Sequence, residues 1–160
     1  MENLSFRKAC KSDERLYFNW INDSQVRDQS FNSNFVNWEE HVEWFSNKLN
    51  DKNCHFYLFQ NIENQFVGQV RIQKTDELNA IISISVDPKF RGLGYGSIIL
   101  KLSSIDFLKS QTKILINAFI KEENVASKII FEKAGFTLLE VVNYQNFNSY
   151  HYVNNADREI

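Results

Sequence analysis

Short stretches of alternating hydrophobic and polar residues predict strands, and longer stretches with apolar residues every three or four positions predict helices between them. The alternation predicts strands over residues 4–9, 54–60, 66–73, 80–86, 113–120, 136–142 and 147–153. Helices are expected over residues 12–21, 38–50, 98–108 and 124–134. This order, β-α-α-β-β-β-α-β-α-β-β, predicts a mixed α/β fold formed by a single domain over residues 1–160.

Local signals mark several ends of these elements. Ser12 is a candidate N-cap for the first helix, and Gly135 stands where the last helix needs a left-handed residue. The Asn-rich passage 22–37 is too long for a plain connection, so we expect it to be partly ordered or functional. The second helix is expected to bury a stripe formed by Trp38, Val42, Phe45 and Leu49.

Composition narrows the classes of function. The formal net charge is -2 and 43% of residues are hydrophobic, which argues against a general binder of nucleic acid or anionic membranes. The N-terminus does not resemble a signal peptide, and no apolar run approaches the length of a membrane span. Cys10 and Cys54 show no metal-ligand spacing, so we expect no metal, no disulfide and a cytoplasmic location.

The most informative stretch is residues 86–97, V-D-P-K-F-R-G-L-G-Y-G-S, which holds the only proline and three of the five glycines. A strand precedes it and a helix follows it. Gly92, Gly94 and Gly96 permit positive φ and a close approach to the main chain. The unpaired N–H groups of the helix start then favour a phosphate or pyrophosphate, and Arg91 adds positive charge. The alternative is an ordinary glycine-rich turn, because short glycine patterns often match by chance.

The spacing of Arg91, Gly94 and Gly96 resembles the acetyl-CoA pyrophosphate loop of the GNAT N-acetyltransferases. A second stretch similar to that family follows downstream: Asn124, Ser127, Phe131, Glu132, Lys133, Ala134, Gly135 and Phe136. The resemblance extends over about residues 6–153. It implies a mostly antiparallel sheet of six to seven strands flanked by about four helices, and acetyl-CoA as the cosubstrate.

The resemblance also implies where acetyl-CoA lies. The backbone of Ile84 and Val86 would follow the pantetheine arm, with the Val86 N–H near the acetyl oxygen. Asn124 would contact the arm from the other side, although a plain helix N-cap explains the same residue. The full set implied for the cosubstrate is Ile84, Val86, Arg91, Gly92, Leu93, Gly94, Tyr95, Gly96, Ser97, Asn124, Ser127 and Phe131.

Two departures from the family pattern concern proton transfer. Phe131 stands where the family often has a tyrosine that protonates the leaving thiolate. A thiol has an ordinary pKa of about 8.5, so coenzyme A can leave with little help. Apolar residues occupy the region of the frequent strand glutamate, so His41 and Glu40 are the candidate bases, with a plain surface location as the alternative. The late residues Tyr144, Tyr150, His151 and Tyr152 are further candidates among which the sequence does not choose.

Polar residues on two adjacent predicted strands suggest where the acceptor binds. Gln69 and Arg71 alternate with apolar neighbours on one strand, and Ser83 and Ser85 do so on the next. In register, the four share a face. This face is either the floor of a polar acceptor pocket or a solvated side of the sheet.

The acceptor itself is the least determined part. The passage N-W-I-N-D-S-Q-V-R, with Asn22 and Arg27, resembles a branch that acetylates 4-amino-sugar nucleotides on the way to pseudaminic-type acids. Arg27 or Arg71 can pair with a diphosphate. Alternatives are a protein N-terminal amine, an aminoglycoside, or a non-catalytic acyl-CoA-binding module. We expect a small-molecule amine as partner, no nucleic acid or membrane, and a homodimer as one option.

Overall fold

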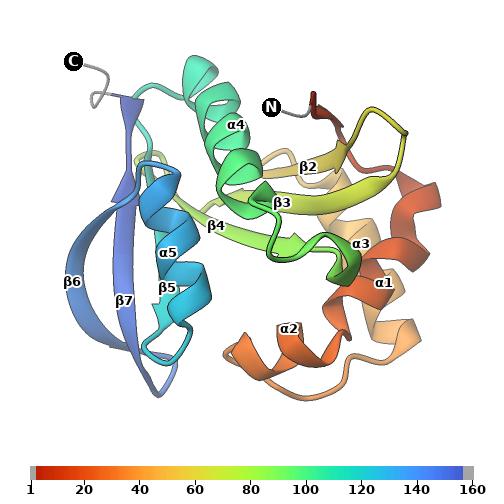
Figure 1. Cartoon of the computed structure of the whole chain (residues 1–160), viewed down its shortest axis with the longest axis horizontal. Coiled ribbons are helices and arrows are strands. Elements are labelled where there is room, and N and C mark those ends of the chain that lie inside the picture. The colour runs from red at the N-terminus through yellow and green to blue at the C-terminus, as the bar shows by residue number, and fades with distance from the viewer. Residues whose placement is uncertain (1–2, 157–160) are drawn as a thin grey trace.

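The computed structural model describes residues 3–156 of the chain (Figure 1). Its strands are β1 (Ser5–Arg7), β2 (Cys54–Gln60), β3 (Phe66–Lys74), β4 (Asn79–Val86), β5 (Leu115–Lys121), β6 (Thr137–Tyr144) and β7 (Phe147–Asn154). Its α-helices are α1 (Glu14–Ile21), α2 (Ser24–Gln29), α3 (Trp38–Asn50), α4 (Tyr95–Ser110) and α5 (Val125–Lys133). Short 3-10 helices, Lys11–Asp13 and Pro88–Phe90, precede α1 and α4. None of the helices within residues 3–156 combines the length and apolar character needed to traverse a bilayer.

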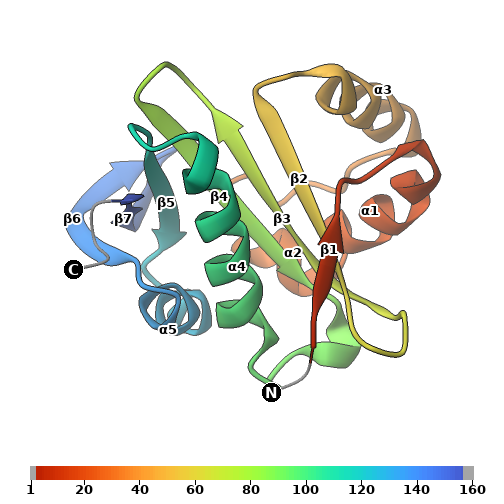
Figure 2. The same cartoon turned by 90° about the horizontal axis from the view of Figure 1, so that it is seen from above.

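The strands form one sheet in the order β1-β2-β3-β4-β5-β7-β6. Neighbouring strands are antiparallel except β4 and β5, which are parallel. Helices α4 and α5 cover one face, and α1, α2 and α3 lie on the other (Figures 1 and 2). The predicted mixed α/β fold with a mostly antiparallel sheet is confirmed. The additional helix, α2, lies in the Asn-rich passage.

The alternation along the strands decides which side chains meet which helices. Val70 and Ile72 of β3 join Ile99, Leu100 and Phe107 of α4 in the larger core. A smaller core under α1 and α3 consists of Ala9, Tyr17, Trp20, Phe45, Phe56 and Leu58. Burying one such large apolar side chain contributes about 1.5–3 kcal/mol. The two cores therefore hold the sheet between two layers of helices.

The start of the first helix differs from the sequence prediction. Cys10, not Ser12, is the N-cap of the 3-10 helix that leads into α1. The Cys10 N–H donates to the Asp13 carboxylate at 2.8 Å, and the Arg7 guanidinium donates to both oxygens of Asp13 at 2.8 and 2.9 Å. A carboxylate three residues after the cap, with its own arginine partner, therefore fixes this helix start.

Helix α3 buries a slightly different stripe from the one predicted. Phe45 and Leu49 pack inward as expected, but His41 is fully buried while Trp38 is only partly buried. Four residues separate His41 from Phe45, so both point to the same side of the helix. An apolar pattern search misses this position because it counts histidine as polar.

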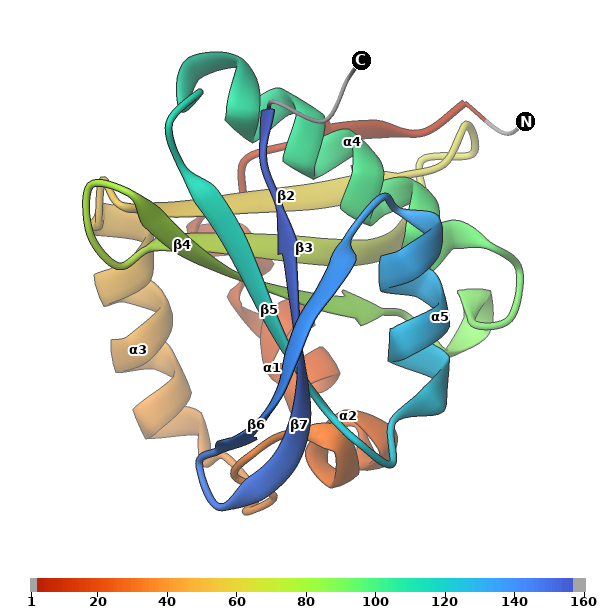
Figure 3. The same cartoon turned by 90° about the vertical axis from the view of Figure 1, so that its left-hand side faces the viewer.

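The feature that positions the candidate site is the divergence of β4 from β5. Their parallel pairing joins only Asn79–Ile81 to Leu115–Asn117. Beyond it, β5 stays paired with β7 as far as Lys121, while β4 stays paired with β3 as far as Val86. The two strands therefore separate into a gap in the middle of the sheet, which Figures 1 and 3 show from two sides.

Candidate active site

The peptide groups of Ile84 and Val86 face the gap between β4 and β5. Residues in an antiparallel pair alternate between hydrogen-bonded and non-hydrogen-bonded positions. The Asp87 N–H donates to the Val67 carbonyl at 2.9 Å, so Val86, opposite Gly68, is at a non-bonded position. Ile84, two residues earlier and opposite Val70, is also at a non-bonded position. The N–H and C=O groups of both residues therefore point away from β3, toward the side from which β5 has departed.

Arg91 holds this end of β4 in place. Its Nε donates to the Val86 carbonyl at 3.1 Å, and its terminal nitrogens donate to Gln25 at 2.9 Å and to the Asp23 carboxylate at 2.6 Å. The Asp23 carboxylate also caps α2 by accepting the Val26 N–H. The sequence suggested that Arg91 offers its charge to a ligand. The structure instead uses the side chain to tie the loop after β4 to the start of α2.

The glycine-rich loop opens α4 to solvent. Gly92 and Gly94 have φ of +75° and +88°, a left-handed conformation that glycine adopts without strain. A Cβ at either position would meet no atom within 4 Å, so backbone conformation and not crowding demands glycine there. Leu93 between them is 67% exposed. The first N–H groups of α4, which begins at Tyr95, therefore open onto an accessible loop, as an anion site requires.

Gly96 has a different reason to be glycine. It is buried, and a Cβ there would lie 3.0 Å from Cδ1 of Ile130 on α5. Gly96 therefore allows α4 and α5 to approach each other beside the gap. Its backbone N–H still belongs to the first turn of α4, so the expected role toward a pyrophosphate stays a prediction.

The second sequence motif begins α5. The Asn124 side chain caps the helix, with Oδ1 accepting the Ser127 N–H at 3.1 Å. Nδ2 of Asn124 donates to no residue in the described part of the chain. Phe131 is only 3% exposed and packs edge-on against Phe136 at 5.0 Å. Its side chain is thus a core residue, and a direct contact with the cosubstrate remains a prediction.

The polar residues expected on the sheet do share one face. Gln69 lies opposite Ser85, and Arg71 lies opposite Ser83. Nε2 of Gln69 donates to the Ser85 hydroxyl at 3.2 Å. Both serines are partly exposed, and this is the face on which α1 and α3 pack. Ser83 and Ser85 therefore lie on the strand beside the gap, on the face opposite α4, and Gln69 and Arg71 lie one strand further away.

Asn22 and Arg27, proposed from sequence as acceptor ligands, organise the Asn-rich passage instead. Nδ2 of Asn22 donates to the Val36 carbonyl at 2.8 Å, and the Val36 N–H donates back to Oδ1 at 2.9 Å. The Arg27 guanidinium donates to the backbone carbonyls of Ile21, Asn32 and Asn34. These bonds occupy both side chains. Loop-closing side chains cannot be told from ligand-binding ones by residue type alone.

The two candidate bases occupy unlike positions. His41 is 1% exposed and stacks on Phe45 at 5.6 Å, with Nε2 lying 2.9 Å from the Glu14 carbonyl. Burial lowers the pKa of His41, although the Glu14 carbonyl acts in the other direction. A neutral ring enclosed in this way has no route for passing a proton to the gap, which argues against His41 as the base. Glu40 is exposed at the start of α3.

Residues of β5, β6 and β7 form a polar and aromatic cluster that the sequence did not predict. His151 lies between Asn117 Oδ1 at 2.8 Å and Glu140 Oε1 at 3.2 Å. The Phe119 ring stacks on His151 and on Tyr144, at 4.5 and 4.0 Å between centroids. The signal that could have found it is the spacing of Asn117 and Phe119, which puts both on the face of β5 opposite its buried isoleucines.

The other two late tyrosines point elsewhere. The Tyr152 hydroxyl is buried and donates to Glu132 at 2.7 Å. Tyr150 lies opposite Ile120 of β5, on the side of α5, where Lys128 Nζ stands 4.8 Å above its ring. No described residue forms a hydrogen bond with the Tyr150 hydroxyl. Tyr150 is thus the late tyrosine on the α5 side of the sheet whose hydroxyl has no partner among the described residues.

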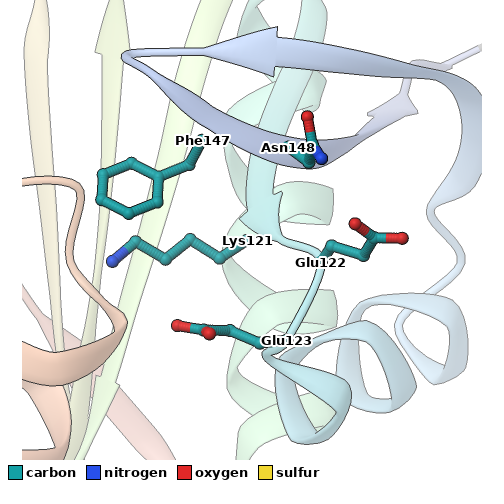
Figure 4. A pocket seen from close by; sticks show the side chains of 5 residues that line it. All are labelled: Lys121, Glu122, Glu123, Phe147 and Asn148. Carbon is teal, nitrogen blue, oxygen red and sulfur yellow. The ribbon is translucent and has the colours of Figure 1, made fainter.

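Lys121 anchors α2 at the end of β5. It is 4% exposed, its Nζ donates to the Asp28 carbonyl at 3.2 Å, and it lies 3.9 Å from the centre of the Phe147 ring. Figure 4 shows the side chain extending alongside that ring. A pocket of about 360 Å³ is lined here by Lys121, Glu122, Glu123, Phe147 and Asn148.

The geometry agrees with the family that the sequence motifs indicate. A family model described as an acetyltransferase (GNAT) domain matches residues 3–137. The chain belongs to the GNAT acetyltransferase family. The prediction of an acetyltransferase that uses acetyl-CoA is thereby confirmed at the level of the family. A search by sequence against curated proteins finds no match.

Solved structures show how widely this GNAT fold is shared. Spermidine N-acetyltransferase from Vibrio cholerae, in complex with CoA and spermine, superposes with a TM-score of 0.84 at 15% identity over 94% of each chain. A domain from Methanocaldococcus jannaschii gives 0.81 at 21% identity, over 97% of this chain and 99% of that one. The aminoglycoside acetyltransferase AAC(6')-Ib, in complex with coenzyme A, gives 0.80 at 15% identity, over 96% and 95%. At these identities the likeness establishes the fold alone.

Proposed function

We propose that this GNAT enzyme transfers the acetyl group of acetyl-CoA to the primary amine of a small molecule by direct attack. The observation that carries the proposal is the pair of peptide groups at Ile84 and Val86 that face the gap. The Val86 N–H can donate to the thioester oxygen, where negative charge develops as the nitrogen attacks. A fixed donor of this kind contributes about 2.7–4 kcal/mol in enzymes where one has been removed.

The cosubstrate fits the groups around the gap. In this proposal the pyrophosphate lies on the first turn of α4, whose N–H groups open onto the exposed loop of Gly92 and Gly94. The pantetheine arm then follows Ile84 and Val86, and Nδ2 of Asn124 contacts it from the start of α5. The thioester thereby comes to rest where β4 and β5 are farthest from pairing.

The chemical step needs few proton carriers. The amine nitrogen forms the C–N bond while the C–S bond breaks, and coenzyme A leaves as a thiolate. Because a thiol has an ordinary pKa of about 8.5, this leaving group needs little protonation; we propose the Tyr150 hydroxyl as the donor when one is used. The amine proton passes to water, and we propose Glu40, exposed at the start of α3, as the carboxylate that receives it through water.

The acceptor is proposed as a small-molecule amine. Two proteins of similar fold are named as acetyltransferases of spermidine and of aminoglycosides, which supports this class over a protein N-terminus. The comparisons give no support to the branch that acetylates 4-amino-sugar nucleotides. That finer acceptor stays one prediction to be included in a panel.

A panel assay tests the proposed function. Purified protein is incubated with acetyl-CoA and primary amines that include spermidine, kanamycin, a 4-amino-sugar nucleotide and a peptide with a free N-terminus. Release of the coenzyme A thiol and the mass of the product are measured. We expect turnover with at least one small amine. Tight acetyl-CoA binding by calorimetry without any turnover would assign the protein to the non-catalytic acyl-CoA-binding class.

We further propose a cytoplasmic homodimer. Free thiols at Cys10 and Cys54 suit a reducing compartment. The edge strand β6 exposes Leu139 and Val141 at 58% and 61%, and an exposed apolar edge strand favours pairing with another chain. Light scattering should give a dimer mass that Val141→Lys converts to the monomer mass, and a monomer in both samples would contradict the proposal.

A further inference from the structure

The sheet face beside the gap carries polar groups that the protein leaves without partners. The Tyr17 hydroxyl and Gln69 Oε1 are both enclosed and form no hydrogen bond with any described residue. Tyr17 is 5% exposed and Gln69 is 9% exposed. A buried polar atom without a partner costs about 1–3 kcal/mol, so such atoms need an explanation. Gln69 belongs to the sheet face that α1 and α3 cover, and Tyr17 lies on α1, which packs on that face.

Arg71 lies on the same sheet face, and its guanidinium forms only one hydrogen bond with the described residues. Its one polar contact is from Nε to the Ser83 hydroxyl at 3.5 Å, which is at the limit of a hydrogen bond. The terminal nitrogens bond to no described residue and are not sealed from solvent. Trp44 of α3 lies under the charge at 5.1 Å. The indole therefore packs against the guanidinium, whose terminal nitrogens keep some contact with solvent and have no described partner.

Among the other described arginines, only Arg15, which is exposed, likewise has neither a carboxylate nor a carbonyl partner. Arg7 and Arg91 each pair with a carboxylate, Asp13 and Asp23. Arg27 donates to three backbone carbonyls. Arg71 has no carboxylate within salt-bridge distance in residues 3–156. Burial also lowers the pKa of its guanidinium below the ordinary value. A desolvated cation without an anion is destabilising.

The position of Arg71 relates it to the reaction. Arg71 is opposite Ser83, and Gln69 is opposite Ser85, on the strand that borders the gap. Alternate residues on a strand point to the same face and lie about 6.6–6.8 Å apart. An amine that approaches the thioester from this face therefore meets Gln69 Oε1 near the end of β4. Arg71 lies two residues further along β3, about 6.6–6.8 Å from Gln69.

We propose that the acceptor carries an anionic group, a carboxylate or a phosphate, to which the two terminal nitrogens of the Arg71 guanidinium donate hydrogen bonds. Gln69 Oε1 accepts an N–H or O–H of the same molecule. The inference rests on the proposed acetyl transfer and narrows its acceptor to amines that bear negative charge. Arginine suits this task because its fixed fork matches the two oxygens of such a group. The polycationic amines spermidine and kanamycin lack it.

Matched pairs of amines test the inference. Glucosamine is compared with glucosamine 6-phosphate, and alanine amide with alanine, so that the phosphate and carboxylate sources are separate arms. The variants are Arg71→Met, Arg71→Lys and the control Arg15→Met. Arg15 also stacks on a tryptophan, Trp38 at 3.9 Å, but it is exposed on α1. Initial rates of thiol release give kcat and KM for each amine.

We expect the wild-type protein to prefer the anionic member of at least one pair by about tenfold or more in kcat/KM, equivalent to about 1.4 kcal/mol. Arg71→Met should remove this preference by raising KM with kcat little changed, and Arg71→Lys should retain part of it. Arg15→Met should behave as the wild type. Faster turnover of spermidine or kanamycin than of every anionic amine would overturn the inference while leaving acetyl transfer in place.

A binding measurement separates the inference from the proposed function when no amine is acetylated. The protein is saturated with coenzyme A, and inorganic phosphate is added at constant ionic strength. Phosphate should raise the unfolding temperature of the wild type and of Arg15→Met but not of Arg71→Met. Equal shifts in all three proteins would assign Arg71 to sheet packing and end the inference.

Discussion

Gly94 and Gly135 share one backbone conformation at two different helix ends. Both have positive φ, +88° and +94°, with open space where a Cβ would stand. A side chain in the left-handed region costs about 1–2 kcal/mol. We expect Gly94→Val to relieve this cost by distorting the start of α4. Its affinity for acetyl-CoA should then fall about tenfold or more, because each 1.4 kcal/mol is a factor of ten.

Gly135→Val is the matched control for that experiment. It introduces the same side chain at a similar φ, but at the C-terminal end of α5. Calorimetric titration with acetyl-CoA should show weaker binding for Gly94→Val only, while both variants lose comparable thermal stability. Equal affinities of the two variants would remove the pyrophosphate from the start of α4.

Phe131→Tyr restores the residue type that the family often has at this position. The sequence predicts that activity stays intact or rises. The structure adds a condition, because the ring is 3% exposed and packs against Phe136. A hydroxyl buried without a partner would cost about 1–3 kcal/mol. Unfolding in urea and the rate of thiol release, measured together, should show unchanged or higher turnover, and complete loss of activity in a folded protein would contradict the prediction.

Some site residues were predictable from sequence and others were not, for a physical reason. The loop glycines and the polar face of Gln69 and Arg71 follow from local spacing and strand alternation. The contact of Arg91 with Asp23 could not be predicted because the two residues are distant in the chain, and only the fold brings them together. Likewise, the burial of His41 depends on aromatic rings from other elements. Residue type and spacing indicate what a side chain can do, while its partners decide what it does.

The Arg7–Asp13 pair tests how one element begins. Burial alone would raise the pKa of Asp13, but the hydrogen bonds from Arg7 and the Cys10 N–H outweigh it and lower the pKa below the ordinary value of an aspartate. Ionised Asp13 therefore stabilises the fold fully above that ordinary value, and its contribution is lost as the pH falls from there through the lowered pKa. We expect Asp13→Asn to lose about 1–3 kcal/mol of unfolding free energy at pH 7.

Urea unfolding of wild type and Asp13→Asn between pH 7 and pH 3 measures this contribution. The difference between the two proteins should be largest at neutral pH and should shrink below about pH 4, near the ordinary pKa of an aspartate. A difference that stays constant down to pH 3 would show that lost packing, and not the ion pair, accounts for the effect.

The elements themselves were largely predictable, with two exceptions. Alternation located all seven strands within a few residues, although only the five inner strands contain fully buried residues and the edge strands β1 and β6 contain none. Helix α2 was missed as a helix because it is six residues long and has no buried residue. The local pattern of residues does not indicate the early divergence of β4 and β5, since it depends on β5 pairing with β7 along its length. Pairing between distant strands leaves no local pattern.

The whole molecule should respond to the cosubstrate. The strands on either side of the gap are joined within the sheet only by the short ladder of Asn79–Ile81 with Leu115–Asn117. A ligand bound between them stabilises the folded state by mass action, about 2.7 kcal/mol at one hundred times its Kd. We expect acetyl-CoA to raise the unfolding temperature of the wild type in scanning calorimetry. No shift at saturating cosubstrate would contradict a site in the gap.

The divergence of β4 and β5 gives the sheet an internal edge. Ile84 and Val86 lie on the fourth of seven strands in the sheet order, yet their amides are as free as those of an outermost strand. In deuterated water these amide protons should exchange much faster than those of Ser83 and Ser85, and acetyl-CoA should slow them. Without the cosubstrate, this stretch also offers an extended peptide from another molecule a place to add as a strand. Bound acetyl-CoA would then cover these unpaired backbone groups and prevent another chain from pairing with them.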